Sequence, residues 1–361
     1  MDTFRVALSG DFLKADGSLA YPSMDLGPLD SDPRIEYAFL TDYPKYERAP
    51  TAFVRPQDLA EFDVYVMYSL RFTQESCKAA DRLALVSRFG VGYDNVDIGA
   101  CADAGVAVTI ATDAVRRPMA TVLVTLILAA TSKLLIKDRI VRAGPARWLS
   151  HMDHVGFGLT GRTLGMIGVG NIGGEAVKLL KPFDLEIVAY DPYADPEKIA
   201  ALGIRLADLE EVFRSADILA VCCALTEETR HLVDAERLAL MKPTAFLVNI
   251  ARGPIVDQDA LVEALAAGRL AGAGLDVLER EPPEADEPIL GLDNVVLSPH
   301  TLGTTDECMR NIFAECVGAA IDVMHGNVPR SVVNRRVLDD DRWQAKLAGY
   351  RRRFGAREVR A

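Results

Sequence analysis

A glycine-rich turn between an apolar run and a helical pattern is the feature that most constrains this chain. Residues 163–167 have the character of a buried strand, the turn at 168–173 reads Gly-Val-Gly-Asn-Ile-Gly, and an amphipathic pattern continues to Leu180. A Gly-x-Gly-x-x-Gly turn of this kind lets the backbone approach a pyrophosphate at the N-terminus of a helix. We therefore expect a dinucleotide to bind at Gly168, Gly170, Asn171, Ile172 and Gly173.

Asp191 supports the same prediction and indicates which dinucleotide binds. It follows an apolar run at residues 186–190 and lies 18 residues after Gly173, close to the roughly 20 residues typical of a ribose-binding acid. A carboxylate accepts hydrogen bonds from both ribose hydroxyls and repels a 2′-phosphate, so NAD is favoured over NADP. The glycine motif alone is weak evidence, and an aspartate before a proline also begins turns. The strand, helix and acid in the right order make the prediction specific.

Length and composition favour two globular domains. The chain is 50% hydrophobic, which is enough to bury a large core. Its 361 residues exceed the length of most single domains. The longest apolar run, at residues 122–130, has the length of a core helix and is shorter than the roughly 18 residues that mark a membrane span. The net charge of −12 disfavours nucleic acid and anionic membranes as partners.

The cysteines and the N-terminal sequence indicate the cytoplasm. No Cys-x-x-Cys pair occurs, so neither a zinc site nor a disulfide is indicated and no metal is expected. The six cysteines are Cys77, Cys101, Cys222, Cys223, Cys308 and Cys316. The opening Met-Asp-Thr-Phe-Arg lacks the basic region followed by an apolar region that a secretion signal requires.

Apolar runs and helical patterns alternate along the chain after Asp191. This alternation is typical of a doubly wound parallel sheet. Strands are predicted at residues 218–222, 244–249, 273–277 and 294–298, and helices at 206–214, 234–241 and 258–267. The region before Arg116 predicts a second, smaller α/β unit, with strand candidates at residues 5–8, 64–67, 83–86 and 106–109.

Three further segments connect or flank these units. Residues 119–142 form a long helical pattern that would bridge the domains and that ends before a Gly-Pro break at 144–145. Residues 9–58 are rich in proline, aspartate and tyrosine, so we expect loops with short elements there. Residues 335–361 are polar and locally basic, and we expect a solvated helix or a frayed tail.

Three ionisable residues follow apolar runs that come after the glycine turn: Arg252, Glu281 and His300. Open α/β sheets bind ligands at the carboxyl ends of their strands, so we expect these side chains to meet at one edge of the sheet. An arginine, a carboxylate and a histidine that converge on a nicotinamide would form a hydride-transfer site. Taken singly, they are also compatible with a surface cation, a rim charge and a loop residue.

Five motifs occur in a fixed order along the chain. They are Gly90-Val-Gly-Tyr-Asp-Asn-Val-Asp97, Gly168-x-Gly170-x-x-Gly173, Asn249-x-Ala-Arg252-Gly253, Asp276-Val-x-x-x-Glu281-Pro282 and Ser298-Pro-His300. Together they resemble the D-isomer-specific 2-hydroxyacid dehydrogenase family, from about residue 60 to Asn334. The resemblance implies two Rossmann-like domains and a homodimer formed largely through the NAD domains. The NAD domain would be a doubly wound parallel sheet at residues 116–300. A smaller, discontinuous flavodoxin-like substrate domain would comprise 1–115 and 301–334, and 335–361 would be a C-terminal extension.

The resemblance also implies a role for each motif. His300 would be the general acid that protonates the carbonyl oxygen of a 2-oxoacid, and Glu281 would hold its imidazole. Arg252 would bind the substrate carboxylate with its planar donor fork. Further substrate contacts would come from Tyr68, Ser69 and the backbone amides of Val91 and Gly92. Further cofactor contacts would come from Thr226, Ile250, Ala251 and Asp276, with Thr226 on the adenosine side and Asp276 facing the nicotinamide carboxamide.

Two places in the chain depart from the family pattern. Cys222 and Ala224 stand where many relatives have histidine and proline, so we expect a looser adenosine pocket. The sequence Ala-Thr-Val at 120–122 stands where relatives commonly have Ala-Glu-His, which bears on substrate identity and on the dimer.

The leading functional hypothesis is an NAD-dependent reductase or dehydrogenase of a small 2-oxo or D-2-hydroxy acid. A corepressor branch of the family gives an alternative, an NAD(H)-sensing protein that acts by binding partners, but the chain lacks a long disordered tail. Formate oxidation is disfavoured because the formate dehydrogenase branch of the family has glutamine where this chain has Glu281. Phosphoglycerate dehydrogenase stays an alternative, although no long regulatory segment follows Asn334.

Overall fold

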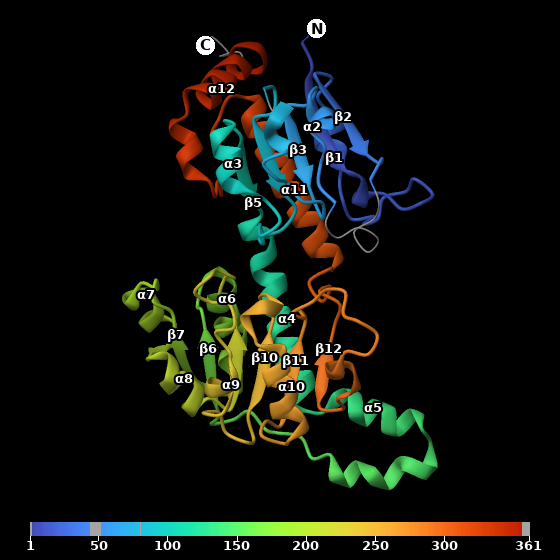
Figure 1. Ribbon diagram of the computed structural model, residues 1–361, viewed down its shortest axis with the longest axis vertical. Helices are drawn as coiled ribbons and strands as arrows, with labels where there is room; N and C mark the ends of the chain where they lie inside the picture. Colours follow the sequence, from blue (N-terminus) through green and yellow to red (C-terminus); the bar gives the residue numbers. More distant parts are fainter. Residues whose placement is uncertain (1, 44–51, 80, 356–361) are drawn as a thin grey trace. The chain divides into compact units, whose positions relative to one another are not determined.

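The computed structural model describes residues 2–43, 52–79 and 81–355, and the chain divides into two compact units (Figure 1). Unit 1 comprises Met1–Val115 and Thr304–Ala361, and unit 2 comprises Arg116–Gly303. Each unit is built around one parallel sheet with helices against it. The predicted α/β class with two parallel sheets is confirmed.

Unit 2 contains a seven-stranded sheet in the order β12-β11-β10-β9-β6-β7-β8. Its strands are β6 (Thr163–Ile167), β7 (Glu186–Tyr190), β8 (Arg205–Leu206), β9 (Ile218–Val221), β10 (Phe246–Asn249), β11 (Gly272–Leu275) and β12 (Val295–Leu297). Its helices include α5 (Leu134–Arg142), α6 (Asn171–Leu180), α7 (Pro196–Ala201), α8 (Leu209–Ser215), α9 (Ala235–Leu238) and α10 (Gln258–Ala266). The strand order reverses beside β6, which is the doubly wound arrangement, so the switch point lies between β6 and β9.

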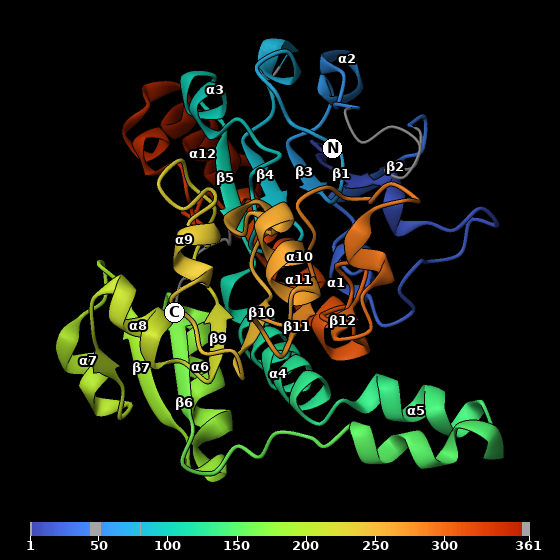
Figure 2. The same ribbon diagram turned by 60° about the horizontal axis from the view of Figure 1, so that its bottom comes forward.

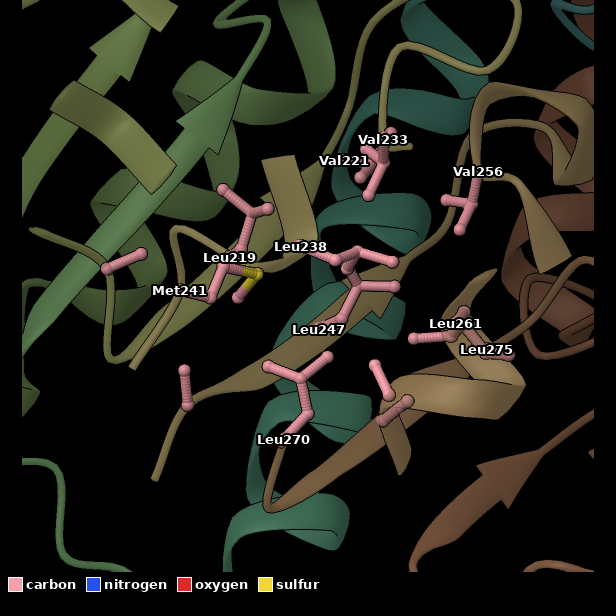
Figure 3. Packing of buried hydrophobic residues seen from close by; sticks show 14 of the residues in the cluster. Leu219, Val221, Val233, Leu238, Met241, Leu247, Val256, Leu261, Leu270 and Leu275 are labelled. Carbon is pink, nitrogen blue, oxygen red and sulfur yellow. The ribbon is translucent and has the colours of Figure 1, made fainter. Parts of the chain in front are cut away.

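The two faces of this sheet carry separate apolar clusters. Side chains alternate across each strand, so Leu219 and Leu247 belong to one cluster, while Ala220 and Val248 belong to the other. Figure 3 shows the first cluster, where strand residues pack near Leu238 of α9 and Leu261 of α10. Because both faces are covered, the strands are continuous apolar runs, which is why the sequence pattern located them.

Unit 1 contains, within its described residues, a parallel sheet in the order β2-β1-β3-β4-β5. This is the flavodoxin-like order. Its strands are β1 (Phe4–Ser9), β2 (Ile35–Leu40), β3 (Val64–Met67), β4 (Leu85–Arg88) and β5 (Ala107–Ile110). Its helices are α1 (Gly27–Asp30), α2 (Pro56–Leu59), α3 (Ile98–Asp103), α11 (Asp306–Met324) and α12 (Asp341–Phe354). The order reverses between β1 and β3, so the carboxyl ends of those strands form the switch point of this unit.

The loops and short elements expected over residues 9–58 are present, and they include one sheet strand, β2, that the sequence did not locate. This six-residue strand pairs in parallel with β1 along its whole length. Its side chains are only partly buried, because it lies at the edge of the sheet, so the apolar pattern is weak there. Part of the expected segment, residues 44–51, lies outside the described residues.

The long helix expected at residues 119–142 is two helices. The first, α4, spans Thr112–Thr131, and it ends before Lys133, which has a left-handed φ of 55° and precedes α5. Among the described residues, α4 alone is long and apolar enough to cross a membrane by length and composition. Of its most apolar stretch, 56% is buried, and Leu123 and Ile127 belong to the core of unit 2, as is typical of a core helix.

The C-terminal segment, expected as a solvated helix or a frayed tail, contains a helix up to Phe354, but one face of that helix is buried. Helix α12 buries Trp343, Leu347, Tyr350 and Phe354, which follow one another at the three- and four-residue spacing of one helix face. The indole Nε1 of Trp343 donates a hydrogen bond to the carbonyl of Ala84 at 3.0 Å. The three consecutive arginines near the end of α12 masked this stripe in the sequence. The clustering of contacts places this helix in unit 1.

Trp343→Ala should therefore destabilise the protein by about 3–5 kcal/mol, because it removes a large, fully buried side chain. Urea unfolding followed by circular dichroism would measure the change. Arg352→Ala, on the exposed face of the same helix, should leave the midpoint unchanged. Equal midpoints for the two variants would contradict the packing of α12 described above.

Candidate active site

The glycine turn lies between β6 and α6, at the switch point of unit 2. Gly168 has a φ of 87°, and a Cβ there would lie 2.9 Å from the backbone of Cys223. A Cβ at Gly173 would lie 2.9 Å from the carbonyl oxygen of Gly168. These two glycines therefore allow the backbone to pack closely. Asn171 and Ile172 form the first turn of α6, where backbone amides are left without helical partners.

Gly170 differs from the other two glycines because nothing described lies within 4 Å of its Cβ position. It is the N-cap of α6, so this open space lies at the positive end of a helix. The packing of the protein itself therefore does not require a glycine at position 170. The space fits the close approach of a pyrophosphate to the backbone.

Asp191 has a structural function in addition to the predicted one. Its Oδ2 accepts a hydrogen bond from the amide of Val169 at 2.9 Å, and its Oδ1 accepts one from the amide of Tyr193 at 3.0 Å. The carboxylate therefore ties the end of β7 to the glycine turn. Each carboxylate oxygen has two lone pairs, so acceptor capacity remains for ribose hydroxyls.

Thr226 lies in an exposed loop after β9 that is closed by its own hydrogen bonds. The amide of Thr226 donates to Thr229 Oγ1 at 2.7 Å, and that hydroxyl donates to the carbonyl of Ala224 at 2.7 Å. These hydrogen bonds brace the loop. The sequence predicted a looser adenosine pocket here, because Ala224 replaces the proline of many relatives. Cys222 precedes the loop, and burial raises the pKa of its thiol to about 12.

Arg252 follows β10 on a loop that a buried asparagine holds. Asn249 Oδ1 accepts from the amide of Ala251 at 2.9 Å, and its Nδ2 donates to the carbonyl of Arg252 at 2.9 Å. Ile250 and Ala251, predicted to contact the cofactor, lie inside this turn. A Cβ at Gly253 would lie 1.8 Å from the carbonyl oxygen of Leu278. The loop after β10 therefore contacts the loop after β11 directly through the backbone.

His300 and Glu281 form a pair. His300 Nδ1 lies 2.9 Å from Glu281 Oε2, and the two side chains are 43% and 32% exposed. The other Glu281 oxygen accepts a hydrogen bond from the amide of Leu278 at 3.0 Å. With Nδ1 engaged, the ring presents Nε2 as its second polar atom.

The surroundings keep Glu281 ionised. Burial opposes the ionisation of Glu281, but hydrogen bonding and charge from His300 outweigh it, and the pKa of Glu281 is lowered. The Leu278 amide and the charge of Arg252 act in the same direction. The three side chains that the sequence singled out thus come from neighbouring loops at the carboxyl edge of one sheet.

Asp276 is the buried centre of this edge. Its amide donates to the carbonyl of Asn249 at 3.1 Å, and its carbonyl accepts from the amide of His300 at 2.8 Å. Its Oδ1 accepts hydrogen bonds from the Ser298 hydroxyl and the amide of Leu302. Asp276 was predicted to face the nicotinamide; the structure shows it joining the ends of β10, β11 and β12. Sequence reasoning missed Asn249 and Ser298 as supports, although both end apolar runs.

The substrate residues predicted in unit 1 follow β3 and β4. Tyr68 OH lies 2.9 Å from Tyr21 OH, and the Tyr68 ring stacks on Phe12. Burial, reinforced by Tyr21, raises the pKa of Tyr68. The hydroxyl of Ser69 donates a hydrogen bond to Asp11, which follows β1. Asp11 and Tyr21 belong to a loop whose purpose the sequence did not indicate.

Val91 and Gly92 lie in the loop after β4, at the same edge of the unit 1 sheet as Tyr68 and Ser69. Both are half-buried. The four substrate residues predicted in unit 1 are thus grouped at the carboxyl ends of two adjacent strands.

Comparison with known proteins agrees with this arrangement. Residues 124–301 match the family model of the D-isomer specific 2-hydroxyacid dehydrogenase NAD binding domain. Glyoxylate reductase of Thermococcus onnurineus is 40% identical over 278 residues, which cover 76% of this chain and 83% of that protein. This chain belongs to the D-isomer-specific 2-hydroxyacid dehydrogenase family. It is an NAD-dependent dehydrogenase.

Other relatives of the dehydrogenase extend the comparison. D-3-phosphoglycerate dehydrogenase of Methanocaldococcus jannaschii is 36% identical over 280 residues, but these cover only 53% of that protein and 77% of this chain. The holo structure of D-mandelate dehydrogenase from Rhodotorula graminis superposes with a TM-score of 0.78 at 26% identity, covering 92% of this chain and 98% of that one.

Gly170→Ala should weaken NADH binding to the dehydrogenase about tenfold or more, because the methyl group would fill the open space at the helix N-terminus. Its effect on stability should stay within about 1 kcal/mol, the usual cost of alanine at an N-cap. Fluorescence titration with NADH and thermal melting would measure both. Gly291→Ala, which also has nothing within 4 Å of its Cβ, should change neither. An unchanged NADH affinity in Gly170→Ala would argue against this turn as the cofactor site.

Proposed function

We propose that the dehydrogenase reduces a small 2-oxoacid to the D-2-hydroxy acid, and catalyses the reverse reaction, with His300 as the general acid and base. The observation that carries the proposal is the His300–Glu281 pair beside the Arg252 loop, at the carboxyl edge of the sheet that bears the glycine turn. The bound nicotinamide would supply or accept the hydride at C2 of the substrate.

His300 supplies the proton in this proposal. Glu281 holds Nδ1 and fixes the orientation of the ring, so Nε2 of the protonated ring can donate a proton to the carbonyl oxygen of the oxoacid. In the reverse direction the neutral ring removes that proton from the hydroxyl. The lowered pKa of Glu281 supports the assignment, because a carboxylate that stays ionised at neutral pH orients the imidazole throughout the cycle.

Arg252 binds and orients the substrate in this proposal. A planar guanidinium can donate two parallel hydrogen bonds to a carboxylate, which fixes both the position and the orientation of a small acid. The hydrogen bonds of Asn249 and the backbone contact at Gly253 hold the loop that carries it. Unit 2 is then the NAD-binding domain.

Unit 1 is the substrate domain in the same proposal. Tyr68, Ser69 and the amides of Val91 and Gly92 would bind the remaining groups of the substrate. Their position supports this, because ligands of such sheets bind at the carboxyl ends of the strands, near the switch point. Asp191 supports a preference for NAD over NADP, since its carboxylate would repel a 2′-phosphate.

The decisive test measures oxidation of NADH and of NADPH with a panel of oxoacids that includes glyoxylate, hydroxypyruvate, pyruvate and 3-phosphohydroxypyruvate. We expect turnover with NADH and at least one of these acids. His300→Asn should lower kcat by about 10²–10⁴ and leave the affinity for NADH unchanged. Asparagine is chosen because His300 has a φ of 57°, which asparagine tolerates.

Two results would contradict the proposed function. If His300→Asn retained the wild-type rate, His300 would not be the general acid and base. A wild-type protein that bound NADH but reduced no oxoacid would favour the NAD(H)-sensing alternative.

We also infer a homodimer formed through unit 2. Exposed apolar side chains gather on α5 and the helical turn η4 (Pro145–Asp153), which run side by side in Figures 1 and 2. Leu149 is 76% exposed and Val155, just beyond η4, is 77% exposed. The other members are Leu134, Leu135, Val141, Trp148 and Met152. Exposed apolar groups gathered in this way are typical of a protein interface, and a second copy of the chain is the proposed partner.

Leu149→Glu combined with Met152→Glu should convert the dimer to a monomer, because charges would be buried in the interface. Light scattering after size-exclusion chromatography would measure the mass. Val328→Glu, at an exposed apolar position in unit 1, should leave the dimer intact. A dimer that survives the double substitution, or a wild type that is monomeric, would show that this surface is not the interface.

The proposed location is the cytoplasm. All six cysteines are free in the structure. Unpaired thiols are usual in reducing compartments, where disulfides are rare.

A further inference from the structure

A second histidine–carboxylate pair involves the loop that carries Glu281. His231 Nε2 is 2.6 Å from Glu279 Oε1, and these side chains are 43% and 32% exposed. Glu279 comes two residues before Glu281, on the same loop after β11. His231 lies 48 residues earlier in the chain, on the loop after β9. Neither residue has a role in the reaction proposed above.

Glu279 fastens its loop to the segment that follows Arg252. Its Oε2 accepts a hydrogen bond from the amide of Gln258 at 3.1 Å, and its own amide donates to Gln258 Oε1 at 3.1 Å. Gln258 is buried, begins α10 and donates from Nε2 to Glu287 Oε1 at 2.9 Å. The two carboxylate oxygens of Glu279 are therefore held by different residues, Oε1 by His231 and Oε2 by the amide of Gln258.

His231 is fastened to the Arg252 loop through its backbone. Its amide donates to the carbonyl of Pro254 at 2.8 Å, and the amide of Val233 donates to the carbonyl of Ile255 at 3.0 Å. The amide of Asp257 donates back to the carbonyl of Val233 at 3.0 Å. The imidazole of His231 thus extends from the loop of Arg252 to the loop of Glu281.

The two loops meet where no side chain separates them. The carbonyl of Leu278 occupies the place of a Cβ at Gly253, one residue after Arg252. A small movement of either loop would therefore change the distance between Arg252 and the His300–Glu281 pair. In enzymes a displacement of about 1 Å can lower the rate by about a hundredfold.

We propose that His231 and Glu279 are positioning residues that fix the Arg252 loop against the Glu281 loop. They do not contact the substrate, and they act through Arg252, so this role rests on the proposed function. The competing interpretation is an ordinary surface ion pair, which contributes little to stability and nothing to substrate binding. The two interpretations differ in their effect on KM for the oxoacid.

The test compares His231→Asn with His231→Gln and Glu279→Gln. Asparagine tolerates the φ of 50° at this position but is too short to reach Glu279, whereas glutamine retains an amide donor of similar reach. We expect His231→Asn to raise KM for the oxoacid about tenfold and to lower kcat, with the affinity for NADH and the melting temperature unchanged. His231→Gln should recover much of the loss.

Glu279→Gln should behave like His231→Asn. It replaces one carboxylate oxygen with an NH₂ donor, which would face either the backbone amide of Gln258 or the ring of His231. The double variant should be little worse than the worse single variant, since both substitutions remove the same link. Arg205→Gln, which breaks a surface ion pair to Glu211 elsewhere in unit 2, should leave all four measured quantities at their wild-type values.

Three results would overturn this role. One is a wild-type KM and kcat in His231→Asn. Another is a fall in melting temperature without a change in KM, which indicates a purely structural pair. The third is an equal loss of NADH affinity, which assigns the pair to the cofactor. A wild-type protein inactive on every oxoacid would instead contradict the proposed function itself, and the positioning role with it.

Discussion

The contact between the backbone at Gly253 and the carbonyl of Leu278 sets the geometry of the whole edge of unit 2. Any side chain at position 253 would separate the loop after β10 from the loop after β11. Asp276 completes the arrangement by joining both strand ends to the backbone of His300. Three loops are thereby held at distances fixed by backbone contacts and hydrogen bonds.

Such an edge needs buried polar groups, and these must be satisfied. Asn249 and Asp276 are almost completely buried, and leaving either without partners would cost about 1–3 kcal/mol. Asn249 binds backbone groups of the Arg252 loop, and Asp276 binds the Ser298 hydroxyl and the amide of Leu302, so these polar atoms favour one arrangement of the loops. A site that gains its order in this way is rigid before a ligand arrives, which suits a reaction that depends on orientation.

The sequence predicted those parts of the fold that local patterns determine. Strands β3, β6 and β7 coincide with the predicted ranges, because apolar runs covered on both faces are unambiguous. β2 was not located within a region expected to hold short elements, and α12 was expected only as a solvated helix or a frayed tail, since an edge strand and an arginine-rich helix show weak apolar patterns. Arg252, Glu281 and His300 could be proposed because each follows a strand, but His231 and Glu279 carry no local signal that would link them.

The two ends of the described chain pack against each other in unit 1. The ring centroid of Phe4 in β1 lies 5.3 Å from that of Tyr350 in α12. The ring of Phe354 also packs against Phe4, with the centroids 5.9 Å apart. Unit 2, by contrast, is one continuous segment. During synthesis on the ribosome, unit 2 can therefore form its core while α12 is still untranslated. The first strand must wait for its last covering helix, so part of its apolar surface stays uncovered for that interval.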